Sequence, residues 1–286
     1  MNVKEKIKSA YKYLSPRYQS IQLNYRVTPT QRFSNRNPHS LLYSIIDERR
    51  DAYKVLLKTF PDYASVFHTI KKEEENINLP SWNNGFLPGL DMISIYCLMA
   101  MFRPAHYIEI GSGNSTKIAR KTITDNKLNT KITSIDPQPR AMIDKISDRI
   151  IRKPVEQINI TETITDTLKE NDFLFIDNSH FVFPNSDAMV CFMEVLPYLK
   201  KGVIVHIHDI FLPYDYPDEM CRRFYNEQYM LAAFLMSNPN RYKIILPNYF
   251  IYSDPKLFNI LDPIWMHPNL KDVEKHGGSF WIQINE

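Results

Sequence analysis

The stretch HYIEIGSGNST, His106 to Thr116, decides the fold class of this 286-residue chain. Its first half, His106–Ile110, is a short apolar run typical of a buried strand, and its second half is a loop with two glycines. The whole chain has only seven glycines, so two in one loop mark a sharp turn or a close approach to a ligand. We therefore predict a strand, a glycine loop and then a helix over Thr116–Thr124.

The alternation of strands and helices continues after this loop. Strands are predicted at Lys131–Asp136, around Ile150, at Asp172–Asp177, at Val203–Asp209, over Tyr242–Ser253 as a strand or hairpin, and at Gly278–Ile284. Helices are predicted at Ser40–Phe60, Asp91–Phe102, Ser186–Gly202 and Asn226–Asn238. The strands are apolar along their whole length, as expected for a largely parallel sheet covered by helices on both faces. The predicted fold class is therefore α/β.

An acid stands where such a sheet binds the ribose of a nucleotide. Asp136 ends the second predicted strand, 23 residues after Gly113, and its carboxylate can accept hydrogen bonds from a ribose diol. The dinucleotide fingerprint would need a third glycine at Thr116, and no G-K-[ST] follows the loop as in a P-loop. The pattern favours an adenosine cofactor other than NAD or ATP.

The segment EIGSG, Glu109–Gly113, resembles motif I of the class I S-adenosylmethionine-dependent methyltransferases. Together with FIDNSHFVFPNSD and GVIVHIHDIFLPYDYP, it makes the chain from about Trp82 to Trp281 resemble the bacterial methyltransferase family 24. The resemblance implies a Rossmann-like seven-stranded, mostly parallel sheet with an antiparallel last strand. It also implies a methyltransferase domain over residues 81–286, which leaves residues 1–80 as an N-terminal helical cap or extension.

The same resemblance implies S-adenosyl-L-methionine as cofactor. The residues that it assigns to cofactor binding are Glu109, Gly111, Ser112, Gly113, Asn114, Ser115, Asp136 and Asp177. The family's frequent third glycine is Ser115 here, so the helix must accommodate a side chain at that position. The loop WNNGFLPG, Trp82–Gly89, is a candidate lid over the cofactor.

Acids and histidines follow the fourth and fifth predicted strands. Asp177 and His180 end one, and His208 and Asp209 end the other. Strand alternation sends His206 to the same face as His208 but deeper, where we interpret it as a core histidine. We expect Asp177, His180, His208 and Asp209 to gather beside the cofactor. Asp177, His208 and Asp209 are candidate ligands of a divalent metal, Mg or Mn, or Fe or Zn because of the histidine.

Asp177-x-x-His180 is also similar to the D-G-S-H segment of metal-dependent macrolide sugar O-methyltransferases. This resemblance implies that Asp177 binds the metal and that His180 is the general base. The catalytic candidates are thus His180, Asp177 and His208. Two alternatives remain open: Asp177 caps a turn, or one of the histidines acts as a base without a metal.

These features predict O-methylation of a hydroxyl on a small polar acceptor, such as a sugar or natural product. N-methylation of a small molecule and a non-catalytic S-adenosylmethionine-binding subunit are the alternatives. A net charge of +3 does not favour nucleic acid, and no apolar run is long enough to span a membrane. Three isolated cysteines favour a cytoplasmic location, and a homo-oligomer is left open.

Overall fold

The computed structural model describes residues 11, 13–15 and 19–286. The chain divides into two compact units, Met1–Thr30 and Gln31–Glu286. The second unit contains the sheet, the site and also residues 31–80. The division at residue 80 that the sequence predicts stays a prediction. In the part of the chain that is described, no helix has the length and apolar character needed to cross a membrane.

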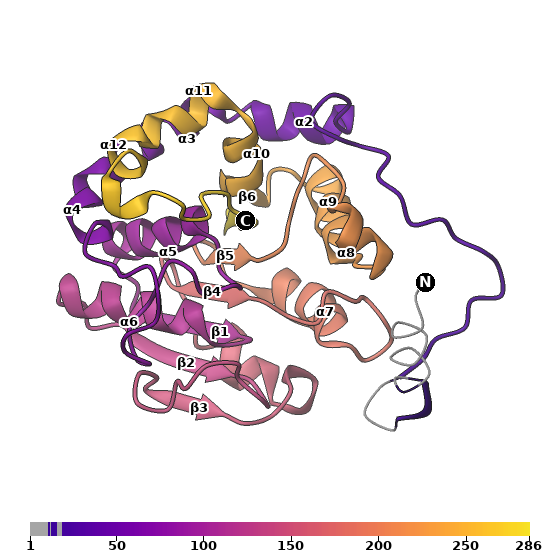
Figure 1. The fold of residues 1–286 in the computed structure, drawn as a ribbon. Helices are drawn as coiled ribbons and strands as arrows, with labels where there is room; N and C mark the ends of the chain where they lie inside the picture. Colours follow the sequence, from indigo (N-terminus) through magenta and orange to yellow (C-terminus); the bar gives the residue numbers. More distant parts are fainter. Residues whose placement is uncertain (1–10, 12, 16–18) are drawn as a thin grey trace. The chain divides into compact units, whose positions relative to one another are not determined.

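A seven-stranded sheet forms the centre of the second unit, with strand order β3-β2-β1-β4-β5-β7-β6 (Figure 1). Its strands are β1 His106–Ile110, β2 Lys131–Ile135, β3 Arg149–Ile151, β4 Phe173–Ile176, β5 Ile204–Ile207, β6 Tyr242–Pro247 and β7 Phe280–Ile284. The strands from β3 to β5 pair in parallel, whereas β7 runs antiparallel to both β5 and β6. The predicted Rossmann-like sheet is confirmed, including its antiparallel last strand.

Helices precede the first strand and connect the later ones. Those before it are α2 Ser40–Asp47, α3 Arg50–Leu57, η1 Phe60–Tyr63, α4 Ala64–Phe67 and α5 Gly89–Phe102. Those between strands β1 and β6 are α6 Asn114–Asp125, η2 Val155–Gln157, η3 Thr161–Thr165, α7 Asp187–Val190, η4 Cys191–Val195, η5 Leu196–Tyr198, α8 Asp218–Arg222 and α9 Glu227–Ser237. Those between β6 and β7 are α10 Asn248–Ser253, α11 Pro255–Phe258, η6 Asn259–Leu261, α12 Asp262–Trp265 and η7 Pro268–Leu270.

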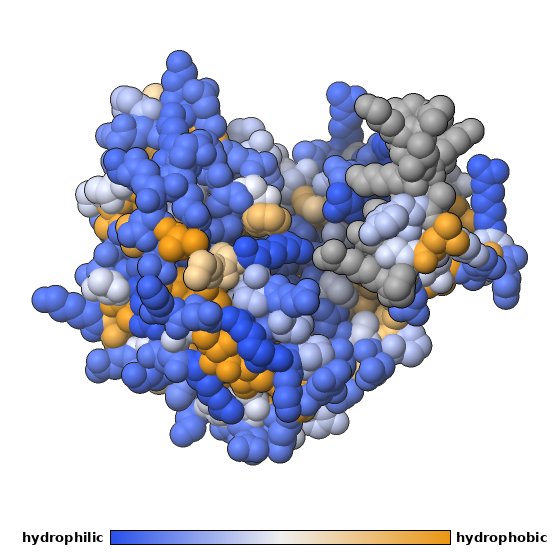
Figure 2. Space-filling model, turned by 60° about the horizontal axis from the view of Figure 1, so that its bottom comes forward, coloured by the Kyte–Doolittle hydropathy of each residue, from blue (hydrophilic) through white to orange (hydrophobic). Residues whose placement is uncertain are grey.

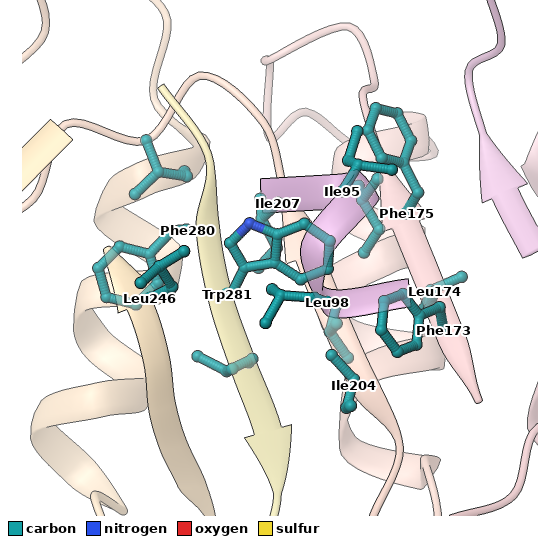
Figure 3. Packing of buried hydrophobic residues seen from close by; sticks show 14 of the residues in the cluster. Ile95, Leu98, Phe173, Leu174, Phe175, Ile204, Ile207, Leu246, Phe280 and Trp281 are labelled. Atoms are coloured by element: carbon teal, nitrogen blue, oxygen red, sulfur yellow. The ribbon is translucent and has the colours of Figure 1, made fainter. Parts of the chain in front are cut away.

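One part of the core lies between the sheet and helix α5, which is mostly apolar and almost wholly buried. Figure 3 shows Trp281 of β7 among side chains of the neighbouring strands, with Leu98 of α5 beside it. The Trp281 and Phe173 rings meet edge to face, with centroids 5.7 Å apart. Burial of side chains this large stabilises a fold by roughly 1.5–3 kcal/mol each. The packing holds β4, β5 and β7 in register, so their ends form a rigid edge.

Three predicted elements differ from the structure. The predicted helix over Ser186–Gly202 is the short helix α7, continued by the π turn η4 and the 3₁₀ turn η5, and it ends at Tyr198. The predicted helix over Ser40–Phe60 is two helices, because the chain bends at Glu48–Arg49 between α2 and α3. The predicted strand or hairpin over Tyr242–Ser253 is strand β6 followed by helix α10. Pro247 has no amide to donate to a sheet, and the Asn248 side chain donates instead to Asp91 and Ser94, at 2.7 Å each.

The surface of the protein is mainly hydrophilic on the face drawn in Figure 2, where hydrophobic residues gather in a few small groups. Single exposed apolar side chains are normal on a globular protein. Two large exposed apolar side chains, Phe86 and Met142, line a cavity beside the glycine loop. These two are relevant to the site.

Candidate active site

The glycine loop connects β1 to α6 and lies against the end of β4. Gly111 has a φ of +80°, and a Cβ at this position would overlap the carbonyl oxygen of Asp177. A side chain here would therefore push the loop away from β4. Gly113 differs, because a Cβ there would meet only Ala141 at 3.9 Å. The first glycine is required by the packing of the chain, and the second leaves room beside the helix N-terminus.

Asp136 holds the glycine loop from the end of β2. One of its carboxylate oxygens, Oδ2, accepts a hydrogen bond from the Ser112 amide at 2.9 Å, and Oδ1 accepts one from the Gln138 amide at 2.7 Å. Asp136 and Ser112 line a cavity of about 430 Å³ together with Gly111, Pro154 and residues near Asp177. This position fits the predicted contact with a ribose, since the carboxylate borders an open space.

Glu109 lies under the loop rather than in a cavity. It is buried, and its carboxylate accepts hydrogen bonds from the hydroxyls of Ser115 at 3.0 Å, Thr116 at 2.5 Å and Ser134 at 2.5 Å. Burial raises the pKa of Glu109 to about 7, although the three hydroxyls oppose this rise. The serine that replaces the family's third glycine therefore anchors Glu109. The role of Glu109 in binding cofactor stays a prediction.

A second cavity of about 320 Å³ lies on the other side of Ser112. Its walls include the start of α6, the segment between α4 and α5, and residues 140–142. The predicted site residues in its lining are Ser112, Gly113, Asn114, Ser115 and Asp177. Ser112, Arg140 and Asp177 border both cavities. The two spaces are adjacent and together border most of the residues assigned to the cofactor.

The ends of β4 and β5 bring the predicted acids and histidines together. His180 Nε2 lies 3.4 Å from Asp209 Oδ2 and 3.9 Å from Asp177 Oδ1. His208 Nδ1 lies 3.7 Å from Asp177 Oδ1 and 3.6 Å from Asp209 Oδ1. His180 and Asp209 both have positive φ angles, 66° and 54°, which non-glycine residues adopt rarely outside constrained sites. The four side chains form one cluster, as the strand positions predict.

The turn after β4 is closed by Asn178. Its side-chain oxygen accepts a hydrogen bond from the His180 amide at 2.8 Å, an arrangement that asparagine favours in turns. The Asp177 carboxylate faces the two histidine rings instead. Burial would raise the pKa of Asp177, but His208 and His180 lower it to about 2. Asp177 is therefore ionised, and it contributes negative charge to the cluster.

A buried glutamate that the sequence did not point to supports His180. His180 Nδ1 and Glu227 Oε1 are 2.5 Å apart, and both residues are buried. The Asn226 amide donates to the His180 carbonyl at 3.0 Å, which places the start of α9 against the turn. Tyr225 stacks on a face of the imidazole, with ring centroids 4.4 Å apart. An acid on one ring nitrogen fixes the tautomer and directs the other nitrogen into the site.

His208 has a comparable buried partner in Asp91 of α5. Asp91 Oδ2 lies 3.3 Å from His208 Nε2, and the carboxylate accepts hydrogen bonds from the amides of Gly278 at 2.8 Å and Ser279 at 3.0 Å. A Cβ on Gly277 would lie 2.5 Å from Asp91 Oδ1, so glycine permits this approach. Burial lowers the pKa of His208, but Asp209, Asp177 and Asp91 together raise it well above the usual value. The sequence signal that could have pointed to Asp91 was its position as the single acid of an otherwise mostly apolar helix.

His206 lies within β5, two residues before His208. It is buried, stacks on Trp281 with ring centroids 4.4 Å apart, and its Nε2 contacts the Ser279 hydroxyl. Burial lowers the pKa of His206 to about 3, so the ring is neutral. The interpretation of His206 as a core histidine is confirmed.

The predicted metal ligands do not form a ligand set in this arrangement. Within residues 11, 13–15 and 19–286, no group of three or more His, Cys, Asp or Glu side chains is placed to hold a metal ion. Both ring nitrogens of His208 face carboxylates, which suits a protonated ring, whereas a metal ligand must offer a neutral nitrogen. The metal site stays a prediction.

The aromatic residues near the site divide into core and surface groups. Trp82 is buried and meets Phe67 and Trp265 edge to face, so it belongs to the core. Phe86 is 57% exposed, lines the cavity beside α6 and lies 5.0 Å from the Arg140 guanidinium. Phe86 is therefore the aromatic residue of the predicted lid segment that borders the site, beside Asn83, Asn84 and Leu87.

Comparison with known sequences finds a methyltransferase family that part of the chain resembles. Residues 108–210 match the family model Methyltransf_24, described as a methyltransferase domain. The match confirms the predicted resemblance to this methyltransferase family over residues 108–210, a stretch that begins within β1 and includes β2, β3, β4 and β5. An uncharacterized protein of Archaeoglobus fulgidus is 27% identical over 135 residues, which cover 44% of this chain and 59% of that protein.

Three solved structures with a similar arrangement are distant in sequence. An S-adenosylhomocysteine-bound methyltransferase from Podospora anserina, PaMTH1, has a TM-score of 0.42 and 16% identity, over 81% of this chain and 88% of its own. The plantazolicin methyltransferase BpumL with the same ligand has a TM-score of 0.42 and 14% identity, over 86% and 100%. CmcI with Mg and SAM has a TM-score of 0.36 and 12% identity, over 67% and 70%. At these values the likeness does not bear on the reaction or the acceptor.

Proposed function

We propose that the protein transfers the methyl group of S-adenosylmethionine to a hydroxyl of a small polar acceptor, such as a sugar or natural product. The observation that carries this proposal is the Glu227–His180 pair after β4. The residues that lead from β4 to His180, Asp177 to Ser179, line the cavity that Asp136 borders. A hydroxyl is a weak nucleophile, so its methylation needs a group that takes its proton. His180 has the geometry of such a base.

The reaction balances with these groups. S-adenosylmethionine supplies a methyl group on a sulfonium, and the sulfur keeps the electron pair of the broken carbon–sulfur bond. The acceptor oxygen forms the new bond to carbon, and its proton goes to His180 Nε2. Glu227 stabilises the imidazolium that results, and Asp177 and Asp209 add negative charge beside Nε2.

The protonation state of His180 sets when it can act. Burial lowers the pKa of His180, but Glu227, Asp209 and Asp177 raise it, and the net direction is upward. A base must be neutral, so the active fraction grows as the pH rises above this raised pKa. We therefore expect the rate to increase from neutral to mildly alkaline pH.

A divalent metal at this site stays a prediction, and no step of the transfer is routed through one. Asp177, Asp209 and His208 are the residues that would bind one, but His208 lies between carboxylates as a charged group would. If a metal is bound, elemental analysis should find a stoichiometric ion and EDTA should inhibit methyl transfer. An active protein without metal would remove the metal from the proposal.

Cofactor binding is the first test of this function. S-adenosylhomocysteine should raise the melting temperature of the protein, because ligands that bind only the folded state stabilise it. Radiolabelled S-adenosylmethionine and a panel of hydroxyl and amine acceptors would then separate O-methylation from N-methylation. A binding protein that turns over neither kind of acceptor would be a non-catalytic subunit.

A further inference from the structure

A buried lysine lies at the start of the helix that follows the glycine loop. Lys117 is the fourth residue of α6, is 2% exposed, and lines the cavity beside Ser112. Its ammonium group forms an ion pair with the carboxylate of Glu74. The Glu74 side chain is 48% exposed and belongs to the segment between α4 and α5, which also lines this cavity. A buried cation thus faces a ligand cavity and pairs with an acid from its wall.

Charge burial makes this arrangement informative. A lysine taken out of water requires a negative partner, because an unpaired buried charge is costly. In the described part of the chain Glu74 is the acid recorded within ion-pair distance of Lys117. Glu74 loses little by returning to water, since it is already half exposed. The pair therefore suits exchange of one carboxylate for another.

The position of the cavity indicates which ligand carboxylate could replace that of Glu74 at Lys117. Asp136 borders the adjacent cavity, where the ribose is expected, and Ser112 and Asp177 border both cavities. A cofactor whose ribose lies at Asp136 and whose chain passes Ser112 reaches Lys117 with its amino-acid end. That end of S-adenosylmethionine carries a carboxylate, which is the group that Glu74 presents to the lysine.

We propose that Lys117 binds the carboxylate of the cofactor's methionine moiety and that Glu74 holds this position until the cofactor arrives. The inference rests on the proposed S-adenosylmethionine-dependent function and adds the residue that recognises one end of the cofactor. Arg140 is the other cation in the cavity lining, but it is exposed and lies over the Phe86 ring. It serves as a matched control.

Two ligands that differ at the amino-acid end give a direct test, since only one of them carries the carboxylate. S-adenosylhomocysteine carries the amino-acid carboxylate, whereas 5′-deoxy-5′-methylthioadenosine keeps the adenosine and sulfur without it. Calorimetry should show that Lys117→Met weakens S-adenosylhomocysteine about 10–100-fold, as expected for loss of a charged hydrogen bond. Methylthioadenosine should bind that variant within about twofold of the wild type, which also shows that the variant is folded.

Glu74→Gln provides a second, surface-located variant. Removal of the competing carboxylate should leave S-adenosylhomocysteine binding equal or tighter, and methylthioadenosine binding unchanged. Equal effects of Lys117→Met on both ligands, or a selective loss in Arg140→Met with none in Lys117→Met, would overturn the inference. Weaker S-adenosylhomocysteine binding in Glu74→Gln would show that Glu74 is not a placeholder. A wild-type protein that binds neither ligand would instead overturn the proposed function and this inference with it.

Discussion

The two halves of the site hold their acids in different ways. On the β1–β2 side, Glu109 and Asp136 are stabilised by hydroxyls and backbone amides. On the β4–β5 side, Asp177 and Asp209 face histidine rings, and Glu227 pairs with His180. Hydroxyls and amides keep one protonation state across the physiological range, whereas histidines titrate within it. The half with the histidines is suited to moving a proton, and the other half, where backbone amides hold Asp136 at the cavity, is suited to binding.

Replacement of His180 should have the largest effect on methyl transfer. If it has none, the β4–β5 side of the site is not the side that moves the proton. His180→Asn removes the base while retaining a residue type that tolerates the positive φ. We expect methyl transfer to fall by about 10²–10⁴-fold, the usual contribution of a general base. S-adenosylhomocysteine should bind as it does to the wild type. Wild-type turnover would remove His180 as base.

Asp136 should give the next largest effect, on binding rather than on proton transfer. Asp136→Ala removes a carboxylate that faces the cavity and holds the Ser112 amide. Loss of charged hydrogen bonds should weaken S-adenosylhomocysteine by about 10–100-fold. Asp136→Asn is the milder control because it keeps an acceptor for the amide. Unchanged binding in the alanine variant would disprove the ribose assignment.

Replacement of Glu227 tests the proton-transferring half of the site through the pH dependence of kcat. In the wild type the carboxylates of Glu227, Asp209 and Asp177 raise the pKa of His180, and Tyr225 covers one face of its ring. Glu227→Gln keeps a hydrogen-bond acceptor but removes one charge. The rising limb of kcat against pH should therefore move to lower pH, while binding of S-adenosylhomocysteine stays within about twofold. A profile identical to the wild type would separate Glu227 from the reaction.

Glu109 should give the smallest effect on cofactor binding and a pH-dependent effect on stability. Its pKa is raised from 4.5 to about 7, so the folded state keeps a proton that the unfolded chain releases in that window. Stability therefore falls as the pH rises, by up to about 3 kcal/mol. Glu109→Gln should lack this fall in denaturant titrations at pH 5 and pH 8. A large loss of S-adenosylhomocysteine binding in the variant would instead favour a direct cofactor contact.

The glycine loop could be predicted because its parts are close in the sequence. His106–Ile110 was predicted with the bounds that the structure has, and the loop and Asp136 follow within the same strand–helix–strand unit. The segment Tyr242–Ser253 was harder, since a short apolar run does not separate strand from helix. Its second half is helix α10, whose first residue, Asn248, bonds to Asp91, a partner distant in the chain.

The sequence by itself determined the α/β sheet, the glycine loop, and the four polar residues at the ends of β4 and β5. Each depends on residues within one or two neighbouring elements, where periodicity and turn chemistry are local. Only the tertiary structure decided which acids support the histidines. Asp91 comes from α5, which precedes the first strand in the sequence, and Glu227 comes from α9, which follows β5. Each acid meets its histidine because its helix packs against the ends of β4 and β5. Contacts of that kind depend on packing, which no local pattern encodes.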